Sequence, residues 1–161
     1  MPELAIPSSP AGLSTTEINR LQQELYLALW GSGDSYWRWQ ASTDIIEVST
    51  ITDIDTAACV ELSPMLEYFQ SIHPEDLHMV MIEWNSHLFN QSDAFDAQYR
   101  IRHGEDWHWI RRRGRAVSRD KAGLAVSITG TTRDISEQHQ DRRNLELLVS
   151  VFDNASEGMC I

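Results

Sequence analysis

The chain has 161 residues, of which 42% are hydrophobic, and its 24 acidic and 13 basic side chains give a formal net charge of −11. This is enough apolar material for one ordinary core. The acidic balance disfavours general nucleic-acid binding, because proteins that gain affinity by neutralising phosphates carry the opposite charge. No stretch approaches the roughly 20 apolar residues that cross a bilayer, and the N-terminus lacks the basic-then-apolar pattern of a secretory signal. We therefore expect a soluble, cytoplasmic module without membrane contact, although its parent protein could carry an anchor elsewhere.

The first residues predict a linker followed by one amphipathic helix. Residues 1–13 contain three of the five prolines among small residues, which is typical of a linker or a disordered lead-in. Ser14 and Glu17 have the spacing of a capping box, which satisfies the exposed amides at a helix start. The apolar residues that follow at helical spacing are Ile18, Leu21, Leu25 and Ala28. We therefore expect a helix over residues 14–31.

The next segment predicts two strands and a second helix. Residues 35–40 and 44–49 have the composition of short strands, whereas the region 51–70 is ambiguous and favours short helical turns. Pro74 suits the first position of a helix, because its missing amide hydrogen would be unpaired there anyway. The apolar stripe of this helix comprises Leu77, Val80, Met81, Trp84 and Leu88.

From residue 95 the apolar period changes from helical to two, which predicts an antiparallel meander. Residues 95–101 alternate in polarity, the segment 107–117 returns after a short turn, and a third strand follows. In that third strand the expected inward residues are Leu124, Val126 and Ile128. A last helix begins near Ser136. The order of elements predicts an α+β domain with a five-stranded antiparallel sheet, helices on one face, and flanking N- and C-terminal helices.

Residues 99–117, at the centre of this sheet, contain six of the 12 arginines and three large aromatic residues. Guanidinium groups stack well on aromatic rings, so these arginines can flank aromatics on the solvated face of a sheet. Trp107 and Trp109 share their face with Arg111 and Arg113, so neither face is cleanly apolar and a bulge is expected. The alternative is an RNA-binding hairpin, which the charge balance disfavours.

Several short motifs, in this order of elements, resemble those of PAS domains, and more narrowly of PAS domains with a C-terminal PAC motif in bacterial signalling proteins. They are Trp37-Arg38-Trp39, His73-Pro74-Glu75-Asp76-Leu77, Tyr99-Arg100, Trp109-Ile110 and Gly130-Thr131-Thr132-Arg133-Asp134-Ile135-Ser136. The resemblance implies a PAS domain over residues 32–135 and a signalling helix over 136–152. It also implies that Asp134 and Ile135 couple the sheet to that helix.

The two ends of the chain resemble each other. LALWGSGDSYW near the start and LVSVFDNASEGMCI at the end both run from an apolar helix tail through small residues and an acid to an apolar strand entry. Aligning Gly33 with Ser156 gives an offset of 123 residues, a plausible module length. We interpret residues 153–161 as the start of a second, truncated PAS-like unit.

The resemblance implies that a flavin, a haem or a small metabolite could lie between sheet and helices, and the cofactor stays unassigned. No cysteine lies in a helical motif like NCRFLQ, which disfavours covalent flavin chemistry. His78 and His87 lie beside the apolar stripe of the second helix, and we expect both to face solvent rather than to ligate a haem.

No metal or catalytic site is predicted. His73, Asp76 and His78 lie close in sequence, but the first is expected at a helix cap and the acids there complement the helix dipole. Cys59 and Cys160 form no CxxC pair, so neither a zinc site nor a disulfide framework is indicated. Because no nucleophile triad, phosphate loop or catalytic carboxylate pair is recognisable, we expect that this fragment is not an enzyme.

A ligand cavity would need aromatic walls with a few polar groups. The candidates for lining it are Trp39, Trp84, Tyr99 and Trp109. The alternative is a solidly packed core, since large rings leave little room in a small domain.

The flanking helices carry apolar stripes that are too exposed to stand alone in water. We expect them to pair with the same helices of a second chain, so that movements of the sheet become shifts of a helix pair in a homodimer. The alternative is that the N-terminal stripe folds back on its own sheet.

The predicted function is a sensory and dimerisation module of a larger bacterial signalling protein. Its output domain would be a diguanylate cyclase or phosphodiesterase acting on cyclic di-GMP, or a histidine kinase. A small-molecule enzyme on a cone-shaped α+β fold and the RNA-binding hairpin are the other classes kept open.

Overall fold

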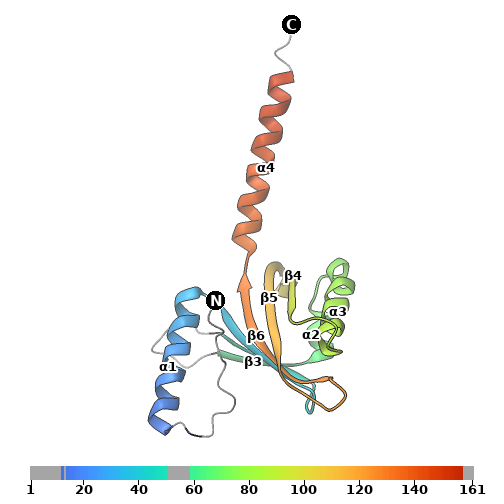
Figure 1. The fold of residues 1–161 in the computed structure, drawn as a ribbon. Helices are drawn as coiled ribbons and strands as arrows, with labels where there is room; N and C mark the ends of the chain where they lie inside the picture. Colours follow the sequence, from blue (N-terminus) through green and yellow to red (C-terminus); the bar gives the residue numbers. More distant parts are fainter. Residues whose placement is uncertain (1–11, 13, 51–58, 158–161) are drawn as a thin grey trace, which may run out of the picture.

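The fold is built on one antiparallel sheet with a helix projecting from one end (Figure 1). The computed structural model describes residues 12, 14–50 and 59–157. The strands are β1 (Ser35–Gln40), β2 (Ile45–Thr50), β3 (Cys59–Pro64), β4 (Phe95–His103), β5 (Asp106–Arg119) and β6 (Ala125–Asp134). The helices are α1 (Thr15–Ser32), α2 (Met65–Gln70), α3 (Pro74–Leu88) and α4 (Ser136–Glu157). The strand order is β3-β2-β1-β6-β5-β4.

The sheet has six strands, one more than the five expected, and the addition is β3. It lies at the edge of the sheet, where Cys59 pairs with Thr50 and Pro64 pairs with Ile45 of β2. Its side chains are mostly exposed and show no alternation of burial. In the region 51–70, which was predicted to form short helical turns, the described residues therefore form the edge strand β3 and then the short helix α2.

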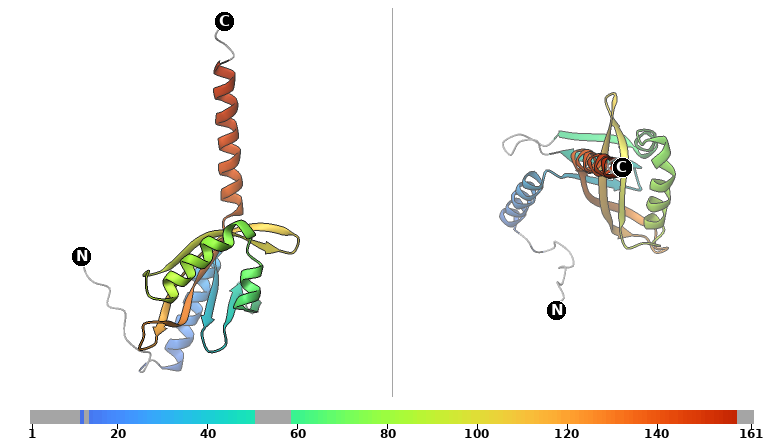
Figure 2. Two further views of the ribbon diagram at one scale, coloured as in Figure 1. Left: turned by 90° about the vertical axis from the view of Figure 1, so that its right-hand side faces the viewer. Right: turned by 90° about the horizontal axis from the view of Figure 1, so that it is seen from above.

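The core lies between the sheet and helices α2 and α3, which cover one of its faces (Figure 2). Its largest fully buried side chains include Trp37, Tyr99, Phe95, Ile46 and Ile128. Aromatic rings from the sheet meet Trp84 of α3 edge-on, and edge-to-face pairs of this kind are favourable beyond their buried area. The side chains predicted to face inward from the strand at 95–101 do so.

The predicted burial of the third meander strand is wrong in part. Val126 is exposed, whereas Ala125 and Ile128 are buried. The cause is a register irregularity opposite Ser118 and Arg119 of the facing strand β5, which pair with Ser127 and Ala125 and skip Val126 between them. Such a bulge changes which side chains point to the core, so strict alternation fails at this point.

The two flanking helices meet the sheet at the same end and then take different paths (Figures 1 and 2). Helix α1 starts with the predicted capping box and lies over the face of the sheet opposite to α3. Helix α4 projects away from the sheet beyond the predicted end at residue 152, through Glu157. The predicted second unit at 153–161 lies partly outside the described residues and stays a prediction.

Candidate functional site

A small cavity lies between the sheet and the covering helices. Its volume is about 10 Å³, and its walls are mainly aliphatic and aromatic. The polar side chains in the wall are Tyr68 from α2, Tyr99 from β4 and Arg112 from β5. This volume is close to the smallest that admits one water molecule.

The two tyrosines form a buried pair. The hydroxyl oxygens of Tyr68 and Tyr99 lie 2.5 Å apart, within hydrogen-bond distance. Burial raises the pKa of both phenols, and the nearby charge of Arg112 offsets this only in part. Both hydroxyls therefore stay protonated at neutral pH.

Arg112 is the one described arginine that is buried, with 3% of its surface exposed. Its guanidinium lies over the ring of Tyr68 at 4.6 Å and over the ring of Trp37 at 5.4 Å. Its Nε donates a hydrogen bond to Oγ1 of Thr132 at 2.8 Å. Its Nη1 is buried without a hydrogen-bond partner among the residues that the structure describes.

The structure brings two of the four predicted cavity residues to this cavity. Trp84 and Tyr99 line it, and Trp39 is buried beside it with its ring 5.3 Å from that of Trp84. Trp109 lies elsewhere, because Tyr99 pairs across the hairpin with Ile110, which places Trp109 on the opposite face of the sheet.

Trp109 instead connects β5 to the first turn of α4. Its backbone N–H donates to Oγ of Ser136 at 3.0 Å, and its carbonyl accepts from the N–H of Ile135 at 2.8 Å. Its indole stacks on the imidazole of His139, with centroids 4.1 Å apart. Both the backbone and the side chain of one residue thus hold the start of the projecting helix.

Asp134 and Ile135 lie at the same junction, and their coupling role stays a prediction. The carboxylate of Asp134 accepts from the backbone N–H of Ser136 at 2.8 Å and lies 3.2 Å from Nδ1 of His108. Burial works to raise the pKa of Asp134, but the hydrogen bonds from Ser136 and His108 outweigh it and lower this pKa. Ile135 is buried, so it anchors the helix start in the domain.

Arg100 extends this junction to α3. It donates to both carboxylate oxygens of Asp76, near the start of that helix, at 2.8–2.9 Å. Its guanidinium also lies 5.3 Å from the centre of the Trp109 ring. A continuous set of contacts therefore runs from α3 through Arg100 and Trp109 to α4.

Comparisons with known proteins agree with this architecture. Residues 57–132 match the model of a family described as the PAS fold. The chain contains a PAS domain. This match agrees with the resemblance to PAS domains that the sequence indicated.

Solved structures resemble this PAS domain at low sequence identity. A sensory box histidine kinase/response regulator from Burkholderia thailandensis aligns with a TM-score of 0.63 and 22% identity, over 81% of this chain and 98% of that one. The N-terminal domain of a diguanylate cyclase with a PAS/PAC sensor from Marinobacter aquaeolei gives a TM-score of 0.48 and 20% identity, over 66% and 98%. The first of these supports the fold.

A curated relative is an uncharacterized protein of Pseudomonas chlororaphis. It is 26% identical over 135 residues, which are 79% of this chain and 52% of the relative. The chain thus spans about half the length of the curated relative that it matches.

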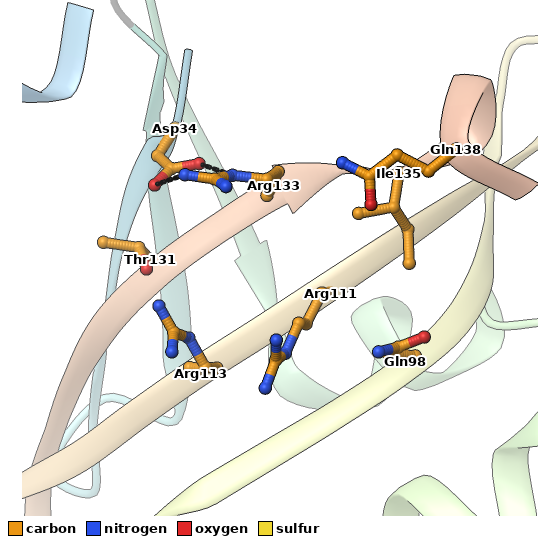
Figure 3. A pocket seen from close by; sticks show the side chains of 8 residues that line it. All are labelled: Asp34, Gln98, Arg111, Arg113, Thr131, Arg133, Ile135 and Gln138. Carbon is orange, nitrogen blue, oxygen red and sulfur yellow. Dashed lines mark hydrogen bonds and ion pairs between the residues drawn. The ribbon is translucent and has the colours of Figure 1, made fainter. Parts of the chain in front are cut away.

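The outer face of the PAS sheet carries a polar pocket of about 120 Å³ beside the start of α4 (Figure 3). Arg133 pairs with Asp34 there, with nitrogen–oxygen distances of 2.6 and 3.0 Å. Arg111 pairs with Asp96 at 2.7 and 2.9 Å. Two arginines of this pocket are thus already paired with carboxylates of the same chain. The alternative that the arginine-rich hairpin binds RNA stays untested.

His87 corrects one sequence interpretation. It was expected to face solvent, but only 1% of its surface is exposed, whereas His78 is exposed as expected. Its Nε2 accepts from the backbone N–H of Ala116 at 2.9 Å, and its Nδ1 lies 3.0 Å from the carbonyl of Ser92. His87 lies at helical spacing from Val80 and Trp84, so the three side chains share one face of α3. This spacing indicates that His87 is buried, although the predicted apolar stripe did not include it.

Arg112 is a second residue that sequence reasoning missed. It follows Ile110 by two positions, and period two in a strand places both side chains on the inner face. Because Arg112 lies between Arg111 and Arg113 in the sequence, all three were assigned to the solvated face of the sheet.

Neither a metal-binding cluster nor a membrane-spanning helix is found in the described ranges. No group of three or more His, Cys, Asp or Glu side chains there is placed to hold a metal ion. No helix in the same ranges combines the length and the apolar character needed to span a bilayer.

Proposed function

We propose that this PAS module senses a ligand or conformational input in its domain and passes the signal through α4 to an output domain. The observation that carries the proposal is the double connection of Trp109 to α4, through two backbone hydrogen bonds and a stacked ring. A change in the position of β5 must move Ser136 and His139 with it. Sheet movement therefore becomes movement of the helix.

We also propose that the working unit is a homodimer formed through the flanking helices. The apolar side chains of α4 are largely exposed, with Leu145 at 63% and Leu148 at 57%. Helix α1 likewise leaves Leu21 and Leu25 about half exposed, although it lies over the outer face of the sheet. Apolar helix faces of this kind gain stability when the same helix of a second chain covers them.

The remaining parts of the proposal come from the sequence resemblance. The parent protein would be a bacterial signalling protein with this module in the cytoplasm, and the segment 153–161 would begin a second PAS-like unit. The output would be a histidine kinase, or a diguanylate cyclase or phosphodiesterase of cyclic di-GMP signalling. The module itself would bind and report rather than catalyse.

The test of dimerisation is the mass of the chain by light scattering across a concentration series. We expect a dimer for the unaltered chain and a monomer for the double variant Leu145→Gln/Leu148→Gln. The matched control is Leu62→Gln/Leu66→Gln, which changes two equally exposed leucines outside the flanking helices and should leave the dimer intact. A monomer at every concentration for the unaltered chain would contradict the proposal.

A further inference from the structure

The polar pocket on the outer face of the sheet collects more positive than negative charge. Arg111, Arg113 and Arg133 line it, and Asp34 is the acidic residue in its wall (Figure 3). Asp34 pairs with Arg133, and Asp96, outside the wall, pairs with Arg111. Arg113 forms no ion pair with the residues that the structure describes. The three arginines and two carboxylates therefore leave one positive charge uncompensated.

The strand register brings these arginines together. Arg111 lies directly opposite Arg133, and Arg113 lies directly opposite Thr131, across β5 and β6. Residues that are directly opposite share a face of the sheet, and like charges in that position repel each other. In agreement with this, Asp34 raises the pKa of Arg133, whereas the charge of Arg111 works to lower it. A negative ion between the guanidinium groups would offset this repulsion.

The pocket contains hydrogen-bond donors that no other side chain in the described ranges engages. Arg111 donates to its carboxylate through Nε and Nη2 only, and Arg133 does the same. Within those ranges, Nη1 of both arginines, the guanidinium of Arg113 and the hydroxyl of Thr131 have no hydrogen-bond partner. The side-chain amide of Gln138 adds a further donor from the first turn of α4.

The start of α4 is a second source of positive potential. Ile135 and Gln138 line the pocket, and α4 begins at Ser136. The N-terminus of a helix carries a partial positive charge and backbone N–H groups that can bind an anion. The arginines of the sheet and the start of this helix thus border the same space.

The pocket has room for a polyatomic anion. Its volume of about 120 Å³ is roughly ten times the smallest volume that holds one water molecule. An anion with several acceptor oxygens can take hydrogen bonds from donors on different sides, and a guanidinium matches phosphate with two parallel bonds. We propose that this pocket binds a phosphate group, either as inorganic phosphate or on a small phosphate ester.

The phosphate would lie where the sheet meets the projecting helix. Arg111 lies two residues after Trp109 on β5, and Gln138 immediately precedes His139, which stacks on Trp109. A phosphate held by Arg111 and Gln138 therefore contacts both sides of this junction. That the phosphate is a signal rests on the proposed sensory function, whereas its binding does not.

Isothermal titration calorimetry on the unaltered chain tests binding. Inorganic phosphate, methyl phosphate and acetate are titrated separately, with sodium chloride balancing the ionic strength. We expect one saturable site for phosphate with a Kd on the order of 1 mM or tighter. Acetate should bind at least about tenfold more weakly, since it has fewer acceptor oxygens. Absence of saturable binding by both phosphate compounds, or equal binding of acetate, would overturn the proposal.

Methyl phosphate distinguishes the two sources of the phosphate group. Weaker binding of the ester than of inorganic phosphate would identify the free ion as the ligand, because the methyl group then fits poorly. Tighter binding of the ester would identify an esterified small molecule.

Variants assign the binding to this pocket. Arg113→Gln removes the unpaired charge and should weaken phosphate binding about tenfold or more. The matched control is Arg115→Gln, which removes the same charge from the next exposed position on that face of β5, outside the pocket, and should bind phosphate like the unaltered chain. Equal weakening by the two variants would indicate diffuse attraction to the surface and would overturn the proposal.

Asp34→Asn provides a change in the opposite direction. It removes the carboxylate that competes for Arg133, so phosphate binding should become about two- to fivefold tighter. Unchanged or weaker binding in this variant would contradict the placement of the phosphate beside Arg133.

Two further measurements locate the ion and separate its binding from signalling. In an NMR titration, the backbone amide resonances of Thr131 and Gln138 should shift with the calorimetric Kd, while that of Leu62 on the edge strand β3 should not. Phosphate should also slow amide hydrogen exchange over residues 137–142. Binding without slower exchange would leave the site intact and contradict only its role as a signal, so the site and the proposed function can fail separately.

Discussion

The indole of Trp109 and the imidazole of His139 are almost parallel, with their planes inclined by 7° and their centroids 4.1 Å apart. The first belongs to the sheet and the second to the projecting helix. The edge-to-face contacts of Trp39 with Trp84 and of Trp37 with Phe95 lie within the core, whereas this stack lies at the junction of two elements that otherwise separate. The start of α4 is therefore held as part of the domain.

Replacing Trp109 should release the helix without unfolding the sheet. In Trp109→Leu, the loss of the stack and of the contact with Arg100 should lower the free energy of unfolding by about 1–2 kcal/mol. Amide hydrogen exchange over residues 137–142 should become faster than in the unaltered chain. Trp107→Leu is the control, since Trp107 is on the same strand but contacts His73 instead. Unchanged exchange in the Trp109 variant would contradict the coupling role.

Gly130 should tolerate no side chain. A Cβ at this position would overlap the carbonyl oxygen of Arg113 on the neighbouring strand. Gly130→Ala should therefore cost about 3 kcal/mol or more, because backbone on both strands must move. Gly31→Ala is the matched control, since nothing lies within 4 Å of its added Cβ and it lies inside α1, where alanine is favoured. Chemical denaturation of both variants measures the difference.

His87 should make stability depend on pH near neutrality. Burial lowers the pKa of His87 below its ordinary value of 6.5, and Arg119 and Arg115 lower it further, while the Ser92 carbonyl and Asp93 act in the opposite direction. The folded state therefore binds this proton less well than the unfolded state. Stability from the neutral imidazole is fully present above pH 6.5 and is lost as the pH falls from there through the lowered pKa.

His87→Gln removes this titration and isolates it from the others. We expect the variant to be less stable than the unaltered chain at pH 8, and the difference to shrink by at most about 1.4 kcal/mol for each pH unit below neutrality. The exposed His78→Gln, on the same helix, should follow the unaltered chain at every pH. A constant difference between His87→Gln and the unaltered chain over this range would refute the prediction.

The pair of Asp76 and Arg100 should stabilise the start of α3. Hydrogen bonds from Arg100 lower the pKa of Asp76 below its ordinary value of 3.8, so its contribution is present above that pH and is lost as the pH falls through the lowered pKa. Asp76→Asn should cost about 2 kcal/mol at pH 7, since three charge-assisted bonds to a mostly buried carboxylate are weakened. Glu75→Gln, whose side chain is 74% exposed, should leave urea denaturation nearly unchanged.

The elements with strong apolar periodicity could be predicted from the sequence. Strand β4 combines local propensity with a buried face, so its pattern and its structure agree, and helix α3 buries Val80 and Trp84 of its predicted stripe. Strand β3 could not be found in this way, because an exposed edge strand is held by backbone pairing and leaves no pattern of burial in its side chains.

The candidate site was harder to predict than the fold, since it depends on which face each side chain takes. The hairpin register pairs Tyr99 with Ile110, and this alone separates Trp109 from the other aromatic candidates. The role of Arg112 depends on what surrounds it in space rather than in sequence. Its missing partner becomes apparent only when the neighbours contributed by α2, β1 and β6 are known together.

The place where the chain enters and leaves the domain has a mechanical consequence. Strands β1 and β6 are adjacent and antiparallel, and Ser35 at the start of one pairs with Thr132 near the end of the other. Tension that pulls α1 and α4 apart would therefore break the pairing of β1 with β6 one residue pair at a time, starting at this end, instead of breaking all pairs at once. The ion pair of Asp34 and Arg133 lies at this end of the pairing and would have to break first. A force that pulls α1 and α4 apart would thus open the sheet between β1 and β6, at low force, before any edge strand detaches.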